Sequence, residues 1–387
     1  MGGDLGVPDT PVALEHSGAQ VTIDLAALVA NWQDLQSRFS GGTCGATIKA
    51  NAYGLGLAPI VKALGAAGCR TFFVALPQEG LLARTAAPEA DIYVLNGLFM
   101  DQAEFYATNR LTPVLATQDE FEEWAQYAER TNQRLPAAIH VDTGMNRLGL
   151  KSDVFHRLIE NQGLMTQIEP SLVMSHLACA DTPDHAMNRE QLARFKAVCS
   201  ALPGIPASLC NSAGIFLGSD FHFDIARPGI ALYGGEAVAG IANPMKPVVS
   251  VKARVLQTRI VRSGESVGYG AAQTADRDMK VATLSCGYAD GYTRLAGSSD
   301  QRRGAKAFVA GKAVPLIGRV SMDMIAVDVT DIPDNLCQRG SMVELFGENI
   351  AVDDVARACD TIGYELLTGI GARAHRHYKP YIAEKVV

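Results

Sequence analysis

Lys49 is the residue at which a reaction could begin. It follows a short apolar stretch, Ala46–Ile48, that indicates the end of a buried strand, and Gly54 and Gly56 open the backbone soon afterwards. A buried ammonium group without a partner tends to lose its charge, which would make this lysine a nucleophile. The ordinary alternative is a lysine that extends from the strand end into water. The residues at the other predicted strand ends favour the first interpretation, a nucleophilic lysine.

Further residues with useful chemistry follow other predicted strands. Each has an ordinary explanation by itself, since an arginine can pair with a surface acid, a serine can cap a helix and a glycine can form a turn. Together they favour a shared site, because the carboxyl ends of barrel strands meet at one rim. They are Tyr53 after the first strand, Arg147 after the fifth, His176 ending the sixth, Asn211 and Ser212 after the seventh, and Arg227, Gly229 and Ile230 after the eighth.

This set of residues could hold pyridoxal 5'-phosphate (PLP). A lysine with a lowered pKa can form a Schiff base with an aldehyde. The turn at Gly229 and Ile230 could bind a phosphate together with the hydroxyls of Ser212 and Tyr53, and barrels often bind phosphate after strands seven and eight. PLP carries both the aldehyde and the phosphate. Arg227 could donate to the ring nitrogen without protonating it, because arginine stays charged in proteins.

Eight short apolar strands alternate with helices over residues 21–243 and would position these residues. This alternation predicts a (β/α)8 barrel of the TIM type. The alternative is an open doubly wound sheet, which is disfavoured because no G-x-G-x-x-G follows an early strand. The clearest helix, Thr117–Arg130, begins with a capping box of Thr117 and Glu120. The predicted strands are Thr43–Lys49, Thr71–Ala75, Ile92–Asn96, Leu111–Leu115, Ala137–Val141, Leu172–His176, Ala207–Cys210 and Phe223–Ala226.

Residues 244–387 have a different pattern and are predicted to form a mainly antiparallel β domain. Val249–Val255 alternates apolar and polar residues, which is typical of a strand with one buried face. Gly311–Lys312 lies between two short apolar runs and predicts a hairpin turn. A single helix is predicted at Asp353–Thr368. Residues 1–20 show no periodicity and are predicted to be an N-terminal tail, which could pack on this domain.

Composition and charge exclude several classes of protein. The 387 residues, 48% of them hydrophobic, suffice for two domains with a large core. A net charge of −7 argues against nucleic acid and anionic membrane partners. The sequence contains no bilayer-spanning apolar run and no secretory signal. None of the eight cysteines forms a C-x-x-C pair, so we expect a cytoplasmic protein without a metal site.

Seven motifs occur in the order in which they occur in alanine racemases. They are TIKANAYGLG, HVDTGMNRLGL, CNSAG, ARPGIALYG, SVGYGA, SCGYADGY and GRVSMDM, and the match runs from about Thr22 to Tyr378. The chain therefore resembles the alanine racemase family of fold-type III PLP enzymes. The resemblance implies a barrel followed by a β domain, and a homodimer with active sites at the subunit interface. It also implies two-base interconversion of L-alanine and D-alanine, which supplies D-alanine for peptidoglycan.

The resemblance implies a role for each matching residue. Lys49 matches the lysine that binds PLP and serves as the base for D-alanine, and Tyr269 matches the base for L-alanine, contributed by the partner subunit. Without the resemblance, Tyr269 would be interpreted as a tyrosine in a glycine-flanked turn. The other matches are Tyr53, Asn211, Ser212, Gly229 and Ile230 around the phosphate, Arg227 at the ring nitrogen, His176 against the ring, Arg147 and Met322 at the substrate carboxylate, and Tyr288 and Asp323 along the substrate channel.

Three positions depart from the family pattern. Leu55 replaces a histidine of the usual A-Y-G-H-G loop, so one hydrogen bond must be absent or replaced. His140 stands where several members have a lysine modified to a carbamate, so Arg147 must be oriented by another group, a water or an anion. Ala372 stands where some members have a phosphate-contacting tyrosine, which predicts one hydroxyl fewer at the phosphate.

Other functions remain compatible with parts of the pattern. A racemase for a broader set of amino acids would have the same motifs. PLP-dependent decarboxylases on this barrel have an acidic partner for the ring nitrogen, where this chain has Arg227. PLP-binding proteins without turnover lack the second domain and would not need Tyr269.

Overall fold

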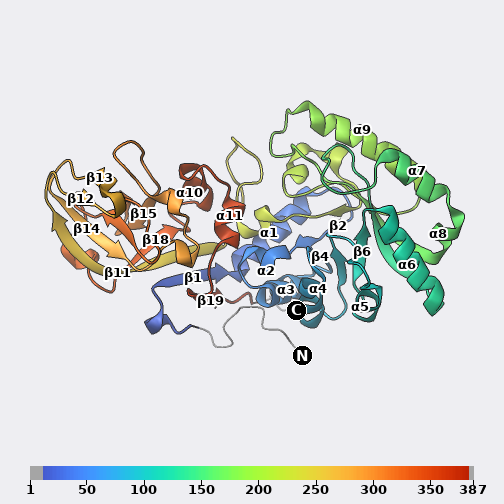
Figure 1. Ribbon diagram of the computed structural model, residues 1–387, viewed down its shortest axis with the longest axis horizontal. Coiled ribbons are helices and arrows are strands. Elements are labelled where there is room, and N and C mark those ends of the chain that lie inside the picture. The colour runs from blue at the N-terminus through green and yellow to red at the C-terminus, as the bar shows by residue number, and fades with distance from the viewer. Residues whose placement is uncertain (1–11, 383–387) are drawn as a thin grey trace.

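The computed structural model describes residues 12–382, so residues 1–11 of the predicted tail lie outside the described range. A barrel of alternating strands and helices lies beside a β domain (Figure 1). The chain crosses between them in residues 234–248, which contain no helix or strand. Among the described residues, no helix is both long and apolar enough to cross a membrane.

The predicted barrel is confirmed. β3 to β9 form a seven-stranded parallel sheet in sequence order, and β10 pairs with β2. The ring closes between β9 and β10, where the N–H of Asp224 donates to the carbonyl of Ala207 at 2.9 Å. This closure rules out an open sheet. The strands are β2 (Thr43–Cys44), β3 (Ala46–Thr47), β4 (Thr71–Val74), β5 (Asp91–Val94), β6 (Thr112–Leu115), β7 (Leu135–His140), β8 (Ile168–Met174), β9 (Ala207–Ser208) and β10 (Ile225–Ala226).

Helices cover the outside of the barrel (Figure 1). The predicted capping box of α6 is present, since the N–H of Glu120 donates to the Thr117 hydroxyl at 3.3 Å and the Glu120 carboxylate accepts from the N–H of Thr117 at 3.0 Å. The helices are α1 (Leu25–Arg38), α2 (Lys49–Tyr53), α3 (Leu57–Ala66), α4 (Pro77–Ala86), α5 (Ala103–Thr108), α6 (Gln118–Thr131), α7 (Ser152–Glu160), α8 (Gln162–Gln167) and α9 (Ala186–Ala201).

The inside of the barrel is filled by apolar side chains. This cluster is made of Phe73, Tyr93, Val114, Ala138, Leu172 and Met174, all buried. A barrel interior packed in this way is a core and leaves no room for a ligand. Polar residues that act on a ligand must therefore stand at the strand ends.

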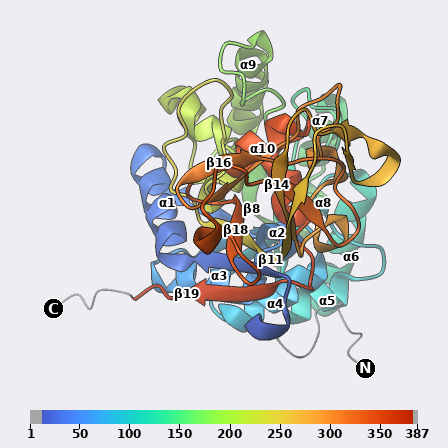
Figure 2. The ribbon, with the colours of Figure 1, turned by 90° about the vertical axis from the view of Figure 1, so that its left-hand side faces the viewer.

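The β domain is built on a sheet of eight strands. Its order is β16-β15-β18-β11-β1-β19, and β14 and β17 extend it beside β11. All pairs are antiparallel except β1 with β19. Seen from the end of this domain, its strands lie in front of the barrel (Figure 2). The eight strands are β1 (Ala19–Asp24), β11 (Val249–Val261), β14 (Met279–Leu284), β15 (Lys306–Val309), β16 (Lys312–Pro315), β17 (Ile325–Asp328), β18 (Met342–Phe346) and β19 (His375–Lys379). β12 (Ser266–Val267) and β13 (Gln273–Thr274) form a separate antiparallel pair.

The start of the barrel differs from the prediction. Residues 21–24 were assigned to the barrel, but they belong to β1, which pairs with β11 and β19 in the β domain. The alternating burial of β1 is typical of a strand with one face on a core. The described part of the predicted tail also contacts this domain, because the N–H of Arg254 donates to the carbonyl of Gly18 at 2.8 Å.

Two local predictions in the β domain are wrong. The hairpin turn between β15 and β16 is Ala310–Gly311, one residue earlier than predicted, and both residues have positive φ (49° and 80°). Two-residue hairpin turns favour such a pair because it matches the strand twist. The predicted single helix is broken into α10 (Val352–Ala358) and α11 (Gly363–Thr368), with Asp360 at a φ of 55° between them.

Candidate active site

Lys49 stands at a left-handed turn. The predicted strand through Lys49 ends at Thr47, and Lys49 begins α2. The next four residues, Ala50–Tyr53, all have φ values between 53° and 55°. Such a conformation costs about 1–2 kcal/mol for each L-residue, so the surrounding structure must hold it.

Hydrogen bonds from neighbouring loops hold this turn. The Glu79 carboxylate of α4 accepts from the N–H of Asn51 at 3.1 Å and from the N–H of Ala75 at 3.0 Å, and so links the turn to the end of β4. The Asn51 side chain accepts from the N–H of Leu57 at 2.8 Å. Sequence reasoning missed Glu79, because nothing in its local pattern shows that it faces a loop 28 residues earlier in the chain.

Leu55 occupies an apolar environment in place of the family's histidine. Its side chain is fully buried in the main hydrophobic core. Its backbone carbonyl accepts a hydrogen bond from the Tyr378 hydroxyl at 2.8 Å. Gly56 is required beside it, because a Cβ at this position would collide with that hydroxyl. The loop is thus tied to β19 of the β domain.

The pKa of the Lys49 ammonium lies below its usual value. Burial is the main cause, the positive charge of Arg147 is the next, and Arg227 adds to it, while Glu79 opposes the shift. The lowered pKa favours the neutral amine, which is the form that can attack an aldehyde or accept a proton.

The buried Arg227 and the half-buried His176 form a pair at the ends of the last three strands. Arg227 is 4% exposed and donates to the Ser175 carbonyl at 2.6 Å, to the Ser208 hydroxyl and to Nδ1 of His176 at 3.4 Å. Burial lowers the pKa of Arg227 to about 10, so the guanidinium is still charged at neutral pH. Burial, then Arg227 and Arg147, hold the pKa of His176 well below its usual value. His176 is therefore neutral, and with Nδ1 accepting, its proton is on Nε2.

A cradle for a phosphate lies beside this pair. The Ser212 hydroxyl accepts from the N–H of Gly229 at 2.8 Å and from the N–H of Ala231 at 3.3 Å, so its own proton is free to donate. A Cβ at position 229 would collide with the Tyr53 hydroxyl, so only glycine lets that hydroxyl approach the backbone here. Ile230 is buried and follows directly. The hydroxyls of Ser212 and Tyr53 at this turn fit a phosphate.

Asn211 and Tyr364 complete the surroundings of the cradle. Asn211 bridges to Arg227 through the backbone, and its side chain accepts from the N–H of Gly214 at 2.9 Å. Tyr364 of α11 packs on Tyr53 with ring centroids 5.9 Å apart. Sequence reasoning missed Tyr364 and considered only Ala372 as the source of a phosphate hydroxyl. Only the packing of α11 against the barrel brings this tyrosine to the site, so no local pattern marked it.

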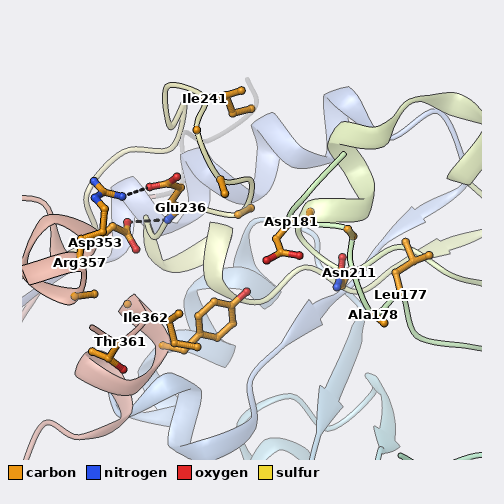
Figure 3. A pocket seen from close by; sticks show the side chains of 18 of the residues that line it. Leu177, Ala178, Asp181, Asn211, Glu236, Ile241, Asp353, Arg357, Thr361 and Ile362 are labelled. Atoms are coloured by element: carbon orange, nitrogen blue, oxygen red, sulfur yellow. Dashed lines mark hydrogen bonds and ion pairs between the residues drawn. The ribbon is translucent and has the colours of Figure 1, made fainter. Parts of the chain in front are cut away.

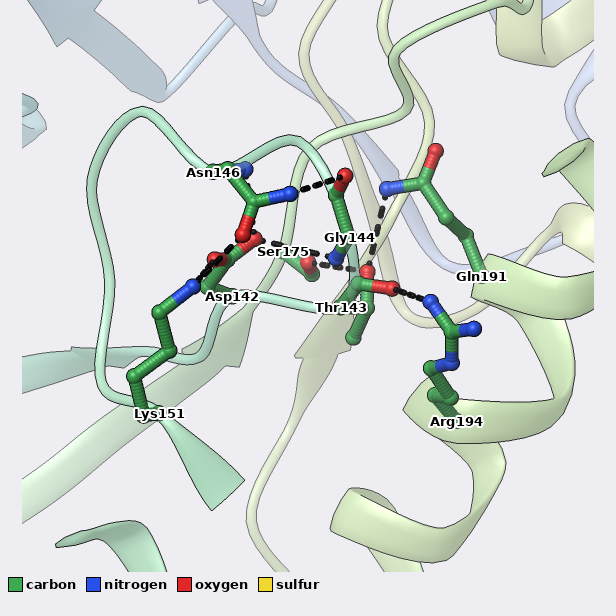
Figure 4. Close-up of polar contacts among 8 residues, drawn as sticks. All are labelled: Asp142, Thr143, Gly144, Asn146, Lys151, Ser175, Gln191 and Arg194. Atoms are coloured by element: carbon green, nitrogen blue, oxygen red, sulfur yellow. Dashed lines mark hydrogen bonds and ion pairs between the residues drawn. The ribbon is translucent and has the colours of Figure 1, made fainter. Parts of the chain in front are cut away.

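The loop Asp142–Arg147 is held by a polar network (Figure 4). The Asp142 carboxylate accepts from the N–H groups of Gly144 and Asn146 at 2.9 and 3.1 Å and pairs with Lys151 at 2.7 Å. Arg147 is exposed at the end of this loop. Within residues 12–382, no hydrogen bond to its side chain is formed, although its charge acts on Lys49.

His140 lies buried below this loop, where several relatives have the modified lysine. It is 7% exposed, and its Nδ1 has no hydrogen-bond partner in the described part of the chain. Burial, followed by the charges of Arg227 and Arg147, lowers the pKa of His140 to about 4. A neutral imidazole therefore replaces the negative carbamate.

A cavity of about 860 Å³ opens above these residues (Figure 3). His176 and Asn211 line it from the barrel, and Ile362 and Tyr364 line it from the β domain. On its outer side the barrel and α10 are joined, because Arg357 pairs with Glu236 at 2.6 Å. The cavity thus gives a small molecule access to the strand ends.

The remaining predicted residues lie on the β domain, away from this cavity. Tyr269 lies between β12 and β13, which Figure 1 shows at the end of the domain far from the barrel. It is 72% exposed, Met322 is 54% exposed and Tyr288 is 42% exposed. Asp323 pairs with Arg373 at 2.8 Å. Within one chain, the structure brings together the barrel residues but does not bring Tyr269 to Lys49.

Comparison with known proteins identifies relatives over nearly the whole chain. Residues 23–237 match the model of the alanine racemase N-terminal domain, and residues 248–378 match that of the C-terminal domain. The chain is 48% identical to the biosynthetic alanine racemase of Agrobacterium fabrum, with 95% of each chain covered. It is 47% identical to the alanine racemase of Rhizobium meliloti, over 94% of this chain and 97% of the relative. The structure of alanine racemase from Bartonella henselae with covalently bound pyridoxal phosphate is 41% identical, with a TM-score of 0.88, and covers 94% of this chain and 100% of that one.

Proposed function

The chain belongs to the alanine racemase family and is a PLP-dependent isomerase, and we propose that Lys49 and Tyr269 act as its two bases on opposite faces of the cofactor. When bound, PLP draws electrons from the Cα–H bond of the amino acid and makes that proton removable. The hydrogen-bonded pair of the buried Arg227 and the half-buried His176, next to a lysine with a lowered pKa, is the observation that carries the proposal.

The barrel residues fit PLP in three places. Lys49 would hold it covalently, and its lowered pKa favours the neutral amine that this requires. Tyr53, Ser212, Gly229 and Ile230, with Tyr364 and Asn211 beside them, would hold the phosphate. Arg227 would donate to the ring nitrogen, with His176 against the ring. Because Arg227 is still charged at neutral pH, it would leave that nitrogen unprotonated and so limit side reactions.

The two bases need different help from the protein. Lys49 can take the proton on the D-alanine side because its amine is readily neutral. The second base, Tyr269, carries a phenol, and a phenol is a weak base at neutral pH. The Nε2–H of His176 would donate to the phenolate and stabilise it, while Arg227 holds the opposite nitrogen. Removal and return of the proton on opposite faces inverts Cα.

We propose a homodimer in which the partner subunit supplies Tyr269. Within one chain Tyr269 lies far from Lys49, yet it belongs to a set of large exposed apolar side chains that also includes Tyr288, Met322 and Met324. Tyr269 and Met324 line one hollow of the β domain, and exposed apolar side chains that adjoin one another indicate an interface. In this arrangement Arg147 and Met322 would bind the substrate carboxylate, and Tyr288 and Asp323 would line the channel.

Arg373 supports this account of the channel. It pairs with Asp323 at 2.8 Å and with Asp290 at 2.9 Å, and so fixes the loops that carry Tyr288 and Asp323 to each other. We also propose that the enzyme acts in the cytoplasm and supplies D-alanine for peptidoglycan. All eight cysteines are free thiols, as a reducing compartment requires.

Chiral analysis tests the activity directly. Purified protein loaded with PLP is incubated with L-alanine, and the enantiomers are separated at intervals. D-alanine is expected to rise until the two enantiomers are equal, and the reverse reaction should reach the same mixture. Failure of the PLP-loaded protein to form D-alanine would contradict the function. Parallel rates with L-serine and L-lysine would show whether the specificity is broader.

A further inference from the structure

Gln191 is a fully buried amide outside the proposed set of catalytic residues. It lies on α9, which packs on the outside of the barrel, and it is 0% exposed. Its Oε1 accepts from the N–H of Ala178 at 2.8 Å. Its Nε2 donates to the carbonyl of His176 at 2.8 Å and to the hydroxyl of Thr143 at 3.1 Å. Three short bonds from one buried amide fix the two loops that they reach.

The two loops carry different parts of the proposed site. Thr143 begins the loop that leads to Arg147, and Figure 4 shows Gln191 reaching it from α9. The Thr143 hydroxyl also shares a hydrogen bond of 2.8 Å with the Ser175 hydroxyl. The Ser175 carbonyl in turn accepts from Arg227 at 2.6 Å. A buried chain of hydrogen bonds therefore runs from Arg227 through Ser175 and Thr143 to Gln191.

We propose that Gln191 is a positioning residue that holds His176 and the Arg147 loop in one fixed arrangement. Without Gln191, the His176 backbone would lose its tie to α9. Thr143 would keep only its contact with Ser175 and the bond from Arg194 to its carbonyl, beside the contacts of Asp142 within the loop. This inference rests on the roles proposed above for His176 and Arg147. With the neutral His140 in place of a carbamate, the loop backbone carries more of the task of placing Arg147.

The substitution Gln191→Met tests this role, with Asn188→Leu as its matched control. Methionine has nearly the shape of glutamine but makes none of the three hydrogen bonds. Asn188 lies one turn earlier on α9, is 1% exposed and likewise makes three hydrogen bonds, all from its Nδ2, to the carbonyls of Cys179, Thr182 and Pro183. None of these reaches His176 or Thr143, so the control removes similar bonds from the same helix.

We expect Gln191→Met to lower kcat/KM for L-alanine about 10²-fold, because small misplacements of reacting groups have effects of this size. KM should rise through Arg147, and kcat should fall through His176. The visible absorption maximum of bound PLP should also shift, because His176 would lie against the ring. A purely structural role would lower only the active fraction, as in Asn188→Leu. Equal kcat/KM, KM and absorption maximum in the two variants would overturn the inference.

The substitution Gln191→Glu covers the case in which the methionine variant does not fold. A protonated glutamic acid can donate to the His176 carbonyl as the amide does, whereas the carboxylate cannot. The activity of Gln191→Glu relative to the wild type should therefore rise as the pH falls. A ratio that stays constant with pH would contradict the role. If the wild-type enzyme racemises alanine and this ratio stays constant, the proposed function stands and only the role of Gln191 is rejected.

Discussion

The barrel half and the β-domain half of the proposed site differ in how complete they are within one chain. In the barrel half, Arg227 is 4% exposed and hydrogen-bonded to Ser175, Ser208 and His176. In the β-domain half, Tyr269 is 72% exposed and Met322 is 54% exposed. The first half is fixed before any ligand arrives, whereas the second requires another surface.

This difference separates two kinds of substitution. Buried polar groups lose their solvation and depend on their partners, so a change in the barrel half affects cofactor binding and stability together. An exposed tyrosine has little influence on the fold of its own chain, so a change at Tyr269 should affect the reaction alone. Substitutions in the two halves should therefore separate loss of cofactor binding from loss of rate.

Lys49→Ala is expected to have the largest effect. It removes both the covalent attachment of PLP and one base. Loss of one acid–base group typically lowers the rate about 10²–10⁴-fold, so the activity of this variant should fall further than that. The purified variant should also lack the visible absorbance of covalently held PLP. Absorbance spectra and racemisation rates provide the measurement, and circular dichroism checks the fold. A persistent visible band in the absence of substrate would contradict the role of Lys49.

Tyr269→Phe should lower the rate while leaving cofactor binding unchanged. Loss of one acid–base group typically costs about 10²–10⁴ in rate, or roughly 3–5 kcal/mol of transition-state stabilisation. Because Tyr269 is exposed in its own chain, the variant should remain yellow and unfold at the wild-type temperature. The rates, the PLP spectrum and the melting temperature test this together. Full activity would exclude Tyr269 as a base.

Mixing these two variants tests whether the halves come from different subunits. A mixed dimer of Lys49→Ala and Tyr269→Phe subunits would contain one intact site and one doubly altered site. Random reassociation should therefore restore about a quarter of the wild-type activity. Heterodimers isolated with two affinity tags provide the measurement. Verified heterodimers without activity would show that each site is built from one chain.

The fold could be predicted where the signal is local. The apolar strands and the Thr117 capping box are local patterns, and each predicted barrel strand is present. Residues 21–24 were misplaced in the barrel because their alternating pattern does not state which sheet they join, and β1 is paired with β11 more than 200 positions later in the chain. The break between α10 and α11 depends on the left-handed conformation of Asp360, which aspartate can adopt as well as the helical one.

The site could be predicted only in part, because local patterns do not show long-range contacts. Residues at strand ends converge because of the barrel topology, so Lys49, His176 and Arg227 could be grouped from the sequence. Glu79 and Gln191 reach the site through side chains from helices. Glu79 contacts Asn51, 28 residues away, and Gln191 contacts His176 and Thr143, 15 and 48 residues away. No local pattern marks such contacts. Tyr269 required the family resemblance, because its own chain leaves it exposed.

His140 should make the stability of the barrel half depend on pH. Its pKa is lowered from 6.5 to about 4 in the folded protein, mainly by burial. Below pH ~6.5 the unfolded chain binds a proton that the folded chain does not, so stability falls as the pH falls. His140→Asn removes this contribution to the pH dependence of the free energy of unfolding. Between about pH 7.5 and pH 5, the wild type should lose about 2 kcal/mol more than the variant, since one pKa unit corresponds to about 1.4 kcal/mol.

Urea unfolding of both proteins at the two pH values measures this difference. His176 is retained in both, so its own lowered pKa cancels. A parallel pH dependence in the two proteins would contradict the depressed pKa of His140. If the wild type instead became more stable at acid pH, His140 would have to be charged in the folded protein.

Ala50→Gly should have the smallest effect, and its sign is the test. Ala50 is exposed and has a φ of 54°, where alanine is strained by about 1–2 kcal/mol and glycine is not. Ala197 is exposed in the right-handed helix α9, where the same change should destabilise by about 1 kcal/mol. The extra flexibility of glycine in the unfolded chain offsets part of the relieved strain. Ala50→Gly should therefore be neutral or stabilise the protein by up to about 1 kcal/mol. Equal losses of melting temperature in both variants would show that the turn after Lys49 is unstrained. A loss in Ala197→Gly without a loss in Ala50→Gly would show that the barrel half holds Lys49 against a local backbone preference.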